Sequence, residues 1–339
     1  MSTRPRLTPA MADVRRAIRE LWSEAGVVEG DVIAVALSGG ADSLALMAAA
    51  IFEGNRAGIK IVSATVNHNL QAGSEVVAEK AKQTAIDLGA DRAEVIPISV
   101  PKSSLGMEAA ARNARYEALD AFAQRVGAKF TMLGHTLDDQ AETVLLGLAR
   151  GSGAKSIAGM SMVSADGKYL RPLLNIRRET TVGFCLDSGL EFWSDPQNDD
   201  TKFSRVKVRK TVLPILEQEL GPGIAEALAR TAELVQQDIA YLESQAKQTF
   251  ESLAKTTSNS VIFDAKELAL VPKAIGSRVV HQALLLLGAE PSKSSIDSVY
   301  ELVTDWHGQK PLTLPSVRVE RTGNEIVLKS SKTLKPGAC

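Results

Sequence analysis

The sequence predicts an α/β fold, a doubly wound parallel sheet followed by a second, smaller domain that is α+β and mostly helical. The first half alternates short apolar runs with helical patterns, and most of the helical segments end at a glycine. Such a strand–helix order favours parallel strands with helices on both faces. After about Pro214 the alternation stops and longer helical segments follow.

The first domain begins with the apolar run Asp31 to Leu37, which is short, ends at Ser-Gly-Gly and is therefore predicted to be a buried strand. A helix over residues 42–53 follows and ends near Gly54. Further strands are predicted at 60–66, 93–100 and 128–133, and further helices at 75–88, 107–126 and 137–150. Ligands of such sheets bind at the carboxyl ends of the strands, so the segments after these strands are the candidate sites.

The breaker Gly221-Pro-Gly223 and the long helical stretch after it mark the passage to the second domain. There, helices are predicted near 277–287 and 294–305, and strands near 316–320 and 325–328. We expect a catalytic domain over residues 1–217, a connecting helix over 218–254, a second domain over 255–330 and a disordered tail over 331–339.

Composition excludes several classes of protein. The chain is 45% hydrophobic and 23% charged, a composition typical of a globular protein. Its net charge of −1 gives no sign that it binds a polyanion. The longest apolar run, Leu44 to Phe52, is too short to span a bilayer. The N-terminus lacks a secretory pattern, and Cys185 and Cys339 lack metal-ligand spacing. We therefore expect a cytoplasmic protein without disulfides or membrane contact.

A glycine-rich loop follows the first strand and opens its helix. Its residues are Ser38, Gly39, Gly40, Ala41, Asp42 and Ser43. Adjacent glycines allow a tight turn and a close approach to a ligand, and the N-terminus of the helix favours an anion. The loop is neither a Walker nor a Rossmann pattern. A carboxylate in a phosphate cradle is repulsive unless a cation is present, so Asp42 suggests Mg²⁺. The alternative is an ordinary strand–helix turn capped by Asp42.

A second polar motif follows the fourth strand. His135, Asp139 and Glu142 are spaced four and three residues apart, so they can share one face at a helix N-terminus. They could bind Mg²⁺, hold a cationic substrate or accept a proton. Alternatively, Asp138 and Asp139 only complement the helix dipole, with Thr136 as the N-cap.

Two basic features of the sequence could either bind a ligand or form an ordinary exposed surface. Glu108, Arg112 and Arg115 form one ridge of a helix, which either binds a phosphate or carboxylate or forms an exposed salt bridge. The segment 202–210 carries five basic residues and no acidic one. Such a run is usually a solvated face, so it supports a nucleic-acid interface only beside other signals.

The loop resembles the pyrophosphate loop (PP-loop) of the N-type ATP pyrophosphatases, a Rossmann-like group. Members of that group transfer AMP to a substrate oxygen and release pyrophosphate. The resemblance implies ATP as a substrate and Mg²⁺ at Asp42, but the loop does not choose among the members of the group.

The two motifs, together with further segments, resemble the tRNA(Ile)-lysidine synthetase family, in the same order from about Val32 to Leu216. The further segments are Arg150-Gly-Ser-Gly153, Arg171-Pro-Leu-Leu174, Asp195-Pro-Gln-Asn198, Arg205 and Arg209. The resemblance implies a ligase that adenylylates the C2 oxygen of the wobble cytidine of the CAU anticodon in minor isoleucine tRNA. Free L-lysine then attacks through its side-chain amine and displaces AMP, so that the tRNA decodes AUA instead of AUG.

The resemblance also implies roles for residues. The loop and His68 would bind ATP, and His135, Asp139 and Glu142 would surround the adenylated cytidine and lysine. Arg112 and Arg115 would hold phosphate or substrate in catalysis, and Arg171, Arg205 and Arg209 would contact the tRNA. This chain departs from the family at Asn67-His68-Asn69, where Asp-His-Gly is usual, so a charge role at position 67 is in doubt.

Three alternatives remain open. A tRNA thiolase generally needs catalytic or cluster-binding cysteines, which Cys185 and Cys339 do not suggest. An ammonia-using synthetase such as GMP synthetase has an unlike second domain. A regulatory ATP-binding module without turnover would keep the loop but not need the cluster after the fourth strand. The second domain either holds the tRNA body or only stabilises the fold or a homodimer.

Overall fold

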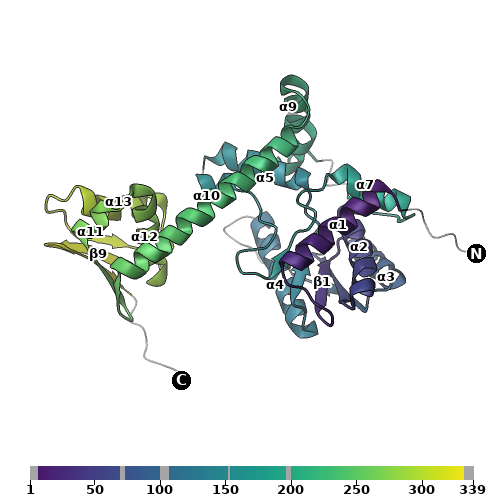
Figure 1. Cartoon of the computed structure of the whole chain (residues 1–339), viewed down its shortest axis with the longest axis horizontal. Coiled ribbons are helices and arrows are strands. Elements are labelled where there is room, and N and C mark those ends of the chain that lie inside the picture. Colours follow the sequence, from purple (N-terminus) through teal and green to yellow (C-terminus); the bar gives the residue numbers. More distant parts are fainter. Residues whose placement is uncertain (1–6, 69–72, 100–106, 152, 196–199, 332–339) are drawn as a thin grey trace, which may run out of the picture. The chain divides into compact units, whose positions relative to one another are not determined.

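Figure 1 shows the computed structural model, which describes residues 7–68, 73–99, 107–151, 153–195 and 200–331. The chain divides into two compact units, Met1–Gln236 and Gln237–Cys339. Helix α10 (Ile224–Leu253) carries the chain from one unit to the other. None of the helices in the described ranges combines the length and apolarity needed to cross a membrane.

The first unit is built on a sheet of five parallel strands in the order β3-β2-β1-β4-β5. The strands are β1 (Val32–Ala36), β2 (Lys60–Asn67), β3 (Arg92–Pro97), β4 (Phe130–Met132) and β5 (Tyr169–Leu170). The strand order reverses beside β1, because β2 and β4 lie on its two sides. The crevice at the carboxyl ends of β1 and β4 is therefore the topological switch point, where ligands bind in such sheets.

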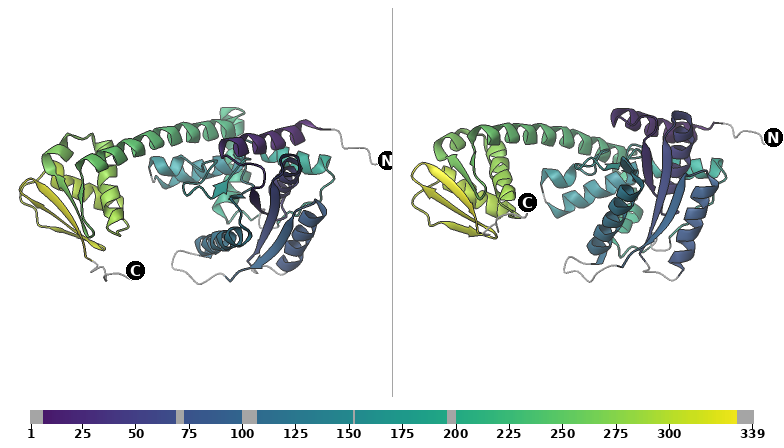
Figure 2. Two further views of the ribbon diagram at one scale, coloured as in Figure 1. Left: turned by 60° about the horizontal axis from the view of Figure 1, so that its bottom comes forward. Right: turned by 90° about the horizontal axis from the view of Figure 1, so that it is seen from below.

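Helices cover both faces of this sheet, as Figures 1 and 2 show. One face carries α1 (Pro9–Glu24), α2 (Ala41–Ala57), α3 (Ser74–Asp87) and α7 (Arg178–Asp187) around the largest apolar cluster. On the other face, α4 (Met107–Val126) packs Leu119 and Phe122 against the sheet. The doubly wound fold predicted from the alternating pattern is confirmed.

The rest of the first unit supports the segment after β4. It comprises α5 (Leu137–Arg150), α6 (Ala154–Ile157), α8 (Ser204–Lys207), the π-helical turn η2 (Val208–Val212), α9 (Leu213–Leu220) and the start of α10. Leu137 and Ala141 of α5 pack against Val208, Leu213 and Ala225. The N-terminus of α5 is thereby fixed beside the switch point.

The second unit contains a five-stranded antiparallel sheet in the order β6-β7-β10-β9-β8. Its elements are β6 (Lys255–Thr256), β7 (Ser260–Asp264), α11 (Ala265–Leu270), α12 (Lys273–Leu286), α13 (Lys293–Thr304), β8 (Leu312–Leu314), β9 (Val317–Thr322) and β10 (Glu325–Ser330). The core lies between the helices and one face of the sheet, where Val319 and Leu328 alternate with the exposed Arg318 and Lys329. This is the smaller α+β domain that the sequence predicts.

Most predicted strands and helices of the first half appear within a few residues of their expected bounds. Helix α1 was not predicted from the sequence, although Thr8 accepts a hydrogen bond from Met11 at its N-terminus and Pro9 occupies its first turn. Residues 196–198 of the Asp195 motif and the predicted tail beyond Ser331 lie outside the described residues.

Candidate active site

The glycine-rich loop is held in shape by its own serines. The Ser38 N–H donates to Ser43 Oγ at 3.1 Å, and Ser43 Oγ donates to the Gly40 carbonyl at 2.9 Å. Gly39 has a φ of +85°, a conformation that favours glycine, and its carbonyl accepts a hydrogen bond from the Trp193 N–H at 2.9 Å. Gly40, the N-cap of α2, has no side chain to bond the first turn. The free N–H groups of that turn can therefore bind an anion.

The segment after β4 lies directly against this loop. A Cβ atom added at Gly134 would meet the backbone of Asp42 and Ser43 at 3.2 Å. Any larger residue at position 134 would push the two segments apart. The missing side chain of Gly134 thus lets the segment after β4 pack against the glycine-rich loop, and the two sequence motifs form one site.

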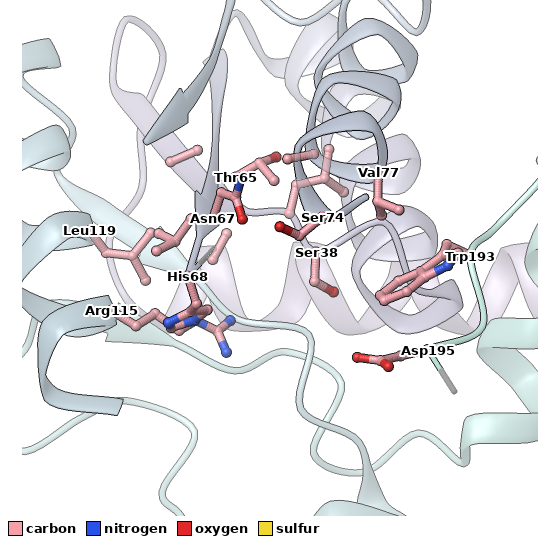
Figure 3. Close-up of a pocket in the computed structure, with 15 residues that line it drawn as sticks. Ser38, Thr65, Asn67, His68, Ser74, Val77, Arg115, Leu119, Trp193 and Asp195 are labelled. Carbon is pink, nitrogen blue, oxygen red and sulfur yellow. The ribbon is translucent and has the colours of Figure 1, made fainter. Parts of the chain in front are cut away.

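A cavity of about 260 Å³ lies beside the loop, between the ends of β1 and β2. Figure 3 shows Ser38 near its middle, with Asn67 and His68 toward one side and Trp193 toward the other. Much of the remaining wall is small or apolar and includes Ala36, Ala64, Val66, Val77 and Leu119. An apolar cleft with a few polar groups at its edge suits a nucleoside.

A second cavity of about 520 Å³ lies over the loop and the N-terminus of α5. It shares Ser38, Arg115 and Trp193 with the first cavity, so the two adjoin. Its charged and titratable lining residues are Asp42, Arg115, His135, Asp139, Arg178, Arg209 and Lys210. The first cavity is thus mainly apolar and the second mainly polar, and the glycine-rich loop lies between them.

Asp42 meets two residues of α7. Its Oδ1 accepts a hydrogen bond from the Thr181 hydroxyl, and its Oδ2 lies 3.3 Å from Arg178 Nε. Burial raises the pKa of the Asp42 carboxyl, against the opposing effect of Arg178. The carboxylate is therefore held in place but lacks full compensation, as expected of a group that receives a further cation.

Asp139 both caps α5 and faces the arginines. Its Oδ2 accepts from the Thr136 N–H at 2.8 Å, and its Oδ1 lies 2.7 Å from Arg178 and 3.4 Å from Arg209. Thr136 is therefore the N-cap, as predicted, and it forms a capping box with Asp139. Although burial disfavours the charged form, Arg178 and the Thr136 N–H hold the pKa of Asp139 below its ordinary value.

Glu142 lies one turn further along α5 and is fully buried. Arg209 binds it with two nitrogens, at 2.6 Å and 3.2 Å, and Arg178 approaches to 3.6 Å. Burial raises the pKa of Glu142, against the opposing effect of Arg209. Glu142 does not line the second cavity, because the two arginines lie around it. Asp42, Asp139 and Glu142 thus share the guanidinium of Arg178, and we call these four residues the carboxylate–arginine cluster.

His135 and Arg115 line the second cavity with their polar groups largely unsatisfied. His135 Nδ1 is buried and has no hydrogen-bond partner among the described residues. Burial lowers the pKa of His135 to about 3, with Asp139 opposing the shift and Arg115 adding to it. Arg115 forms no ion pair with any carboxylate in the described ranges, and burial lowers its pKa. A half-buried guanidinium that lies where two cavities meet, without a described carboxylate beside it, is suited to a phosphate.

The other predicted site residues do not line the second cavity. Arg112 is exposed on α4, with its guanidinium over the Tyr116 ring, and lines neither cavity. Arg171 is buried and donates to the Ser161 carbonyl at 2.8 Å. Arg205 is half-buried on α8. His68 lines the first cavity, and burial followed by the charge of Arg115 lowers its pKa.

Sequence reasoning missed Arg178, Thr181 and Trp193. Arg178 is 136 residues from Asp42 in the chain, so no local spacing connects them. The signal that could have found it is the pair Arg177-Arg178 before an apolar helical stretch. Trp193 precedes the Asp195 motif and closes one side of the loop through its backbone.

The oxygen donors fit Mg²⁺ delivered with a nucleotide, rather than a permanently bound metal. No group of three or more His, Cys, Asp and Glu side chains in the described part of the chain is arranged for a metal. Mg²⁺ needs only one or two carboxylates when phosphate oxygens complete its shell. Asp42 and Asp139, which face the same guanidinium, can supply them.

The low pKa of His135 predicts acid sensitivity. An unfolded histidine binds a proton below about pH 6.5. The folded imidazole stays neutral until about pH 3. The unfolded state therefore binds more protons in this window, and the free energy of unfolding falls as the pH drops through it. Urea unfolding between pH 7 and 4 should show a weaker fall for His135→Asn than for the exposed control His307→Asn. Equal slopes would contradict the burial of a neutral His135.

Comparisons with known proteins identify the chain's relatives. The PP-loop domain family matches residues 11–216. A tRNA(Ile)-lysidine synthase from Leifsonia xyli subsp. xyli is 49% identical over 294 residues, which cover 86% of this chain and 88% of that protein. One from Rhodococcus opacus is 48% identical over 302 residues, which cover 89% of this chain and 88% of that protein.

A solved structure supports the fold alone. The tRNA thiolase NcsA from Methanococcus maripaludis superimposes with a TM-score of 0.57 at 18% identity, over 67% of this chain and 79% of that one. The lysidine synthase relatives, in contrast, align with most of the chain at 48–49% identity. The resemblance predicted from the motifs is thereby confirmed, and the chain belongs to the tRNA(Ile)-lysidine synthase family, within the PP-loop group.

Proposed function

We propose that this chain is a C–N bond-forming, AMP-releasing ligase that converts the wobble cytidine of minor isoleucine tRNA to lysidine. One observation of the geometry carries the proposal. An apolar cavity of nucleoside size adjoins a larger polar cavity, and the glycine-rich loop and Arg115 lie where they meet. An enzyme that transfers AMP between ATP and a second substrate needs such an arrangement.

In the first step, the C2 oxygen of the cytidine attacks the α-phosphorus of ATP, and pyrophosphate leaves. The adenosine occupies the cavity beside His68, and the N–H groups of the loop hold the phosphates in the adjoining cavity that Ser43 also lines. Arg115 stabilises the charge that develops on the α-phosphate, since fixed donors at the reacting centre are usually the largest catalytic term. Adenylylation turns a poor leaving oxygen into a good one.

Mg²⁺ bound with the nucleotide at Asp42 would neutralise the triphosphate. Asp42 is held by Thr181 and Arg178 in a position beside the loop, which supports this assignment. Asp139 is the second carboxylate within reach of the same cation position.

In the second step, the lysine side-chain amine attacks C2, and AMP leaves with the C2 oxygen. The amine has an ordinary pKa near 10.4 and must lose a proton. His135 suits this role poorly because its pKa is so low. Glu142, whose pKa is raised, is the better acceptor once the substrate ammonium takes the position that Arg209 now holds. His135 then serves as a hydrogen-bond partner of the cytidine.

Of the rival functions, the thiolase finds no support in Cys185. This thiol is buried, lies against the Ala41 carbonyl and has its pKa raised to about 12 by burial, which disfavours a reactive thiolate. A non-catalytic ATP-binding module would not need the carboxylate–arginine cluster. Because its substrates are cytoplasmic, we place the enzyme in the cytoplasm.

Amino-acid selectivity tests the proposal. Glu142 and Asp139, which bind the guanidiniums of Arg209 and Arg178, favour a long cationic side chain in the substrate. We expect transfer of lysine to the tRNA, and at least about tenfold lower kcat/KM for ornithine, since one methylene is worth about 10–200-fold. Arginine and ammonia should not be transferred. Competition between labelled amino acids measures this, and comparable incorporation of ornithine would count against the proposed site.

We further propose that the second unit holds the body of the tRNA. Residues 1–236 already contain both cavities, yet a complete folded unit follows. One cytidine cannot distinguish isoleucine tRNA from methionine tRNA, so other contacts must do so. The basic residues assigned to this role are Lys266, Lys273, Arg278, Lys293 and Arg318. Arg205 of the basic run 202–210 extends the tRNA contact on the first unit.

Removing the second unit tests this role. A cut at Leu220 would remove Ala225, Leu228 and Ala229, which pack in the first unit, whereas a chain ending at Ala240 keeps them. That shortened chain should bind ATP normally but lose tRNA affinity and the preference for isoleucine over methionine tRNA. Equilibrium binding of both tRNAs measures this. Full affinity and selectivity in a folded shortened chain would show that the second unit only stabilises the protein.

A further inference from the structure

A third cavity lies outside the active site, along the groove between α1 and α2. Its volume is about 760 Å³, and its wall combines three arginines with an apolar surface. Its lining includes Arg15, Arg19, Trp22, Phe52, Glu53 and Arg56. None of them lines either cavity of the active site.

Two buried donors of this cavity lack partners. The Trp22 indole Nε1 and Arg15 Nε are buried without any hydrogen bond to the described residues. Trp22 as a whole is only 4% exposed. Buried indole N–H groups usually have a hydrogen-bond partner, because an unsatisfied one costs about 1–3 kcal/mol. The cavity is therefore incomplete without a ligand that accepts hydrogen bonds.

The charges of the cavity favour an anion. Arg19 pairs with the buried Glu53 at 2.8 Å, so this carboxylate is already neutralised. Arg15 and Arg56 form no ion pair with any carboxylate in the part of the chain that the structure describes. Both lie against the Phe52 ring instead, at 3.6 Å and 5.8 Å from its centroid. The guanidiniums of Arg15 and Arg56 thus lie beside a partly exposed aromatic ring, and Glu53 is the one carboxylate of this cavity that attracts Arg15.

The cavity is remote from the glycine-rich loop. Asp42 opens α2, whereas Phe52 and Arg56 lie near its C-terminal end. Fourteen residues of helix separate Asp42 from Arg56, which corresponds to about 21 Å. A ligand of this cavity is therefore not the ATP that binds at the loop.

We propose that this cavity binds a nucleotide phosphate, with the phosphate between Arg15 and Arg56 and the sugar or base against Phe52 and the apolar wall. Arginine forks match phosphate geometry, and aromatic rings stack with bases. The nucleotide is either a unit of the tRNA backbone or a free mononucleotide. The first possibility rests on the proposed function, in which the chain acts on tRNA. Binding of a phosphate group as such does not depend on that function.

The test uses the full-length chain with Arg15→Gln and Arg56→Gln combined. The matched control is Arg16→Gln on the same helix, because Arg16 is 59% exposed in its side chain and pairs only locally, with Asp13. Two measurements are made on each protein. One is the affinity for isoleucine tRNA as a function of salt, and the other is the stoichiometry of AMP binding by calorimetry.

If the cavity binds a phosphate of the tRNA, the double variant should bind tRNA about three- to tenfold more weakly. The plot of log affinity against log salt should also become less steep by about 0.7–0.9, which corresponds to the loss of one phosphate contact. If the source is a free nucleotide, the wild type should bind two AMP per chain and the double variant one, with tRNA binding unchanged. A double variant equal to the Arg16→Gln control in both measurements overturns the proposal. Should the double variant fail to fold, Arg56→Glu alone decides by the same criteria.

Lysine transfer at saturating tRNA separates this proposal from the proposed function. The double variant should transfer lysine at the wild-type rate, since the cavity lies apart from the reacting groups. A wild-type chain that transfers no lysine would refute the proposed function, while AMP stoichiometry would still report on the cavity.

Discussion

Replacing Asp42 with asparagine is expected to lower the rate of pyrophosphate release by about 10²–10³-fold, the loss found when one group that stabilises transition-state charge is removed. Asp42 is the carboxylate beside the phosphate loop, and Asn cannot supply the charge that holds a cation against the triphosphate. The fold should persist, because burial already disfavours the ionised form and Thr181 and Arg178 remain in place.

Release of labelled pyrophosphate in the presence of tRNA measures this effect. The matched control is Asp166→Asn, which removes an exposed carboxylate from a turn of the same unit. Thermal melting of both variants verifies the fold. Wild-type turnover in Asp42→Asn would rule out its role at the phosphates.

The second large effect is expected at Arg178, which neutralises three carboxylates at once. In Arg178→Ala, the carboxylates of Asp42, Asp139 and Glu142 would face one another with Arg209 as the remaining cation. Removing one partner of a buried ion pair typically costs about 3–5 kcal/mol. Because a quarter of the Arg178 side chain is exposed, we expect a smaller loss of about 2–3 kcal/mol at pH 7.

Activity should also fall by about 100-fold, since Asp42 and Asp139 lose the group that positions them. The destabilisation should shrink as the pH is lowered toward 4, because protonation of the carboxyls removes their repulsion. Urea unfolding at pH 7 and pH 4 measures this.

The neighbouring Arg177 provides the control for Arg178. It pairs with Asp138 at 3.3 Å and Glu226 at 3.4 Å and lines neither cavity of the active site. Arg177→Ala should keep the activity and lose little stability. Equal effects of the two alanine variants would mean that the carboxylate–arginine cluster has no special role.

The sequence predicted those parts of the site that depend on local chain geometry. The strand before Ser38, the glycines of the loop and the helix after Thr136 all form within a few residues, so apolar runs and capping patterns suffice to find them. In the same way, the position of His135 and Asp139 directly after a predicted strand indicated that they lie at the carboxyl end of the sheet, as Asp42 does.

The contacts that neutralise the site could not be predicted in this way. Arg178 meets Asp42 across 136 residues, and Arg209 meets Glu142 across 67. Only the packing of α7 and η2 brings these side chains together. The sequence shows Arg209 as one member of a basic run, and nothing local distinguishes it from Lys207, which is exposed.

Transfer of labelled lysine to RNA is the decisive measurement of the proposed ligase activity. The full chain is incubated with ATP, Mg²⁺, labelled L-lysine and minor isoleucine tRNA, and the tRNA is digested to nucleosides. We expect one labelled nucleoside derived from the wobble cytidine, formed only with ATP and accompanied by equal amounts of AMP and pyrophosphate. Pyrophosphate release without label in the tRNA, or label at any other nucleotide, would contradict it.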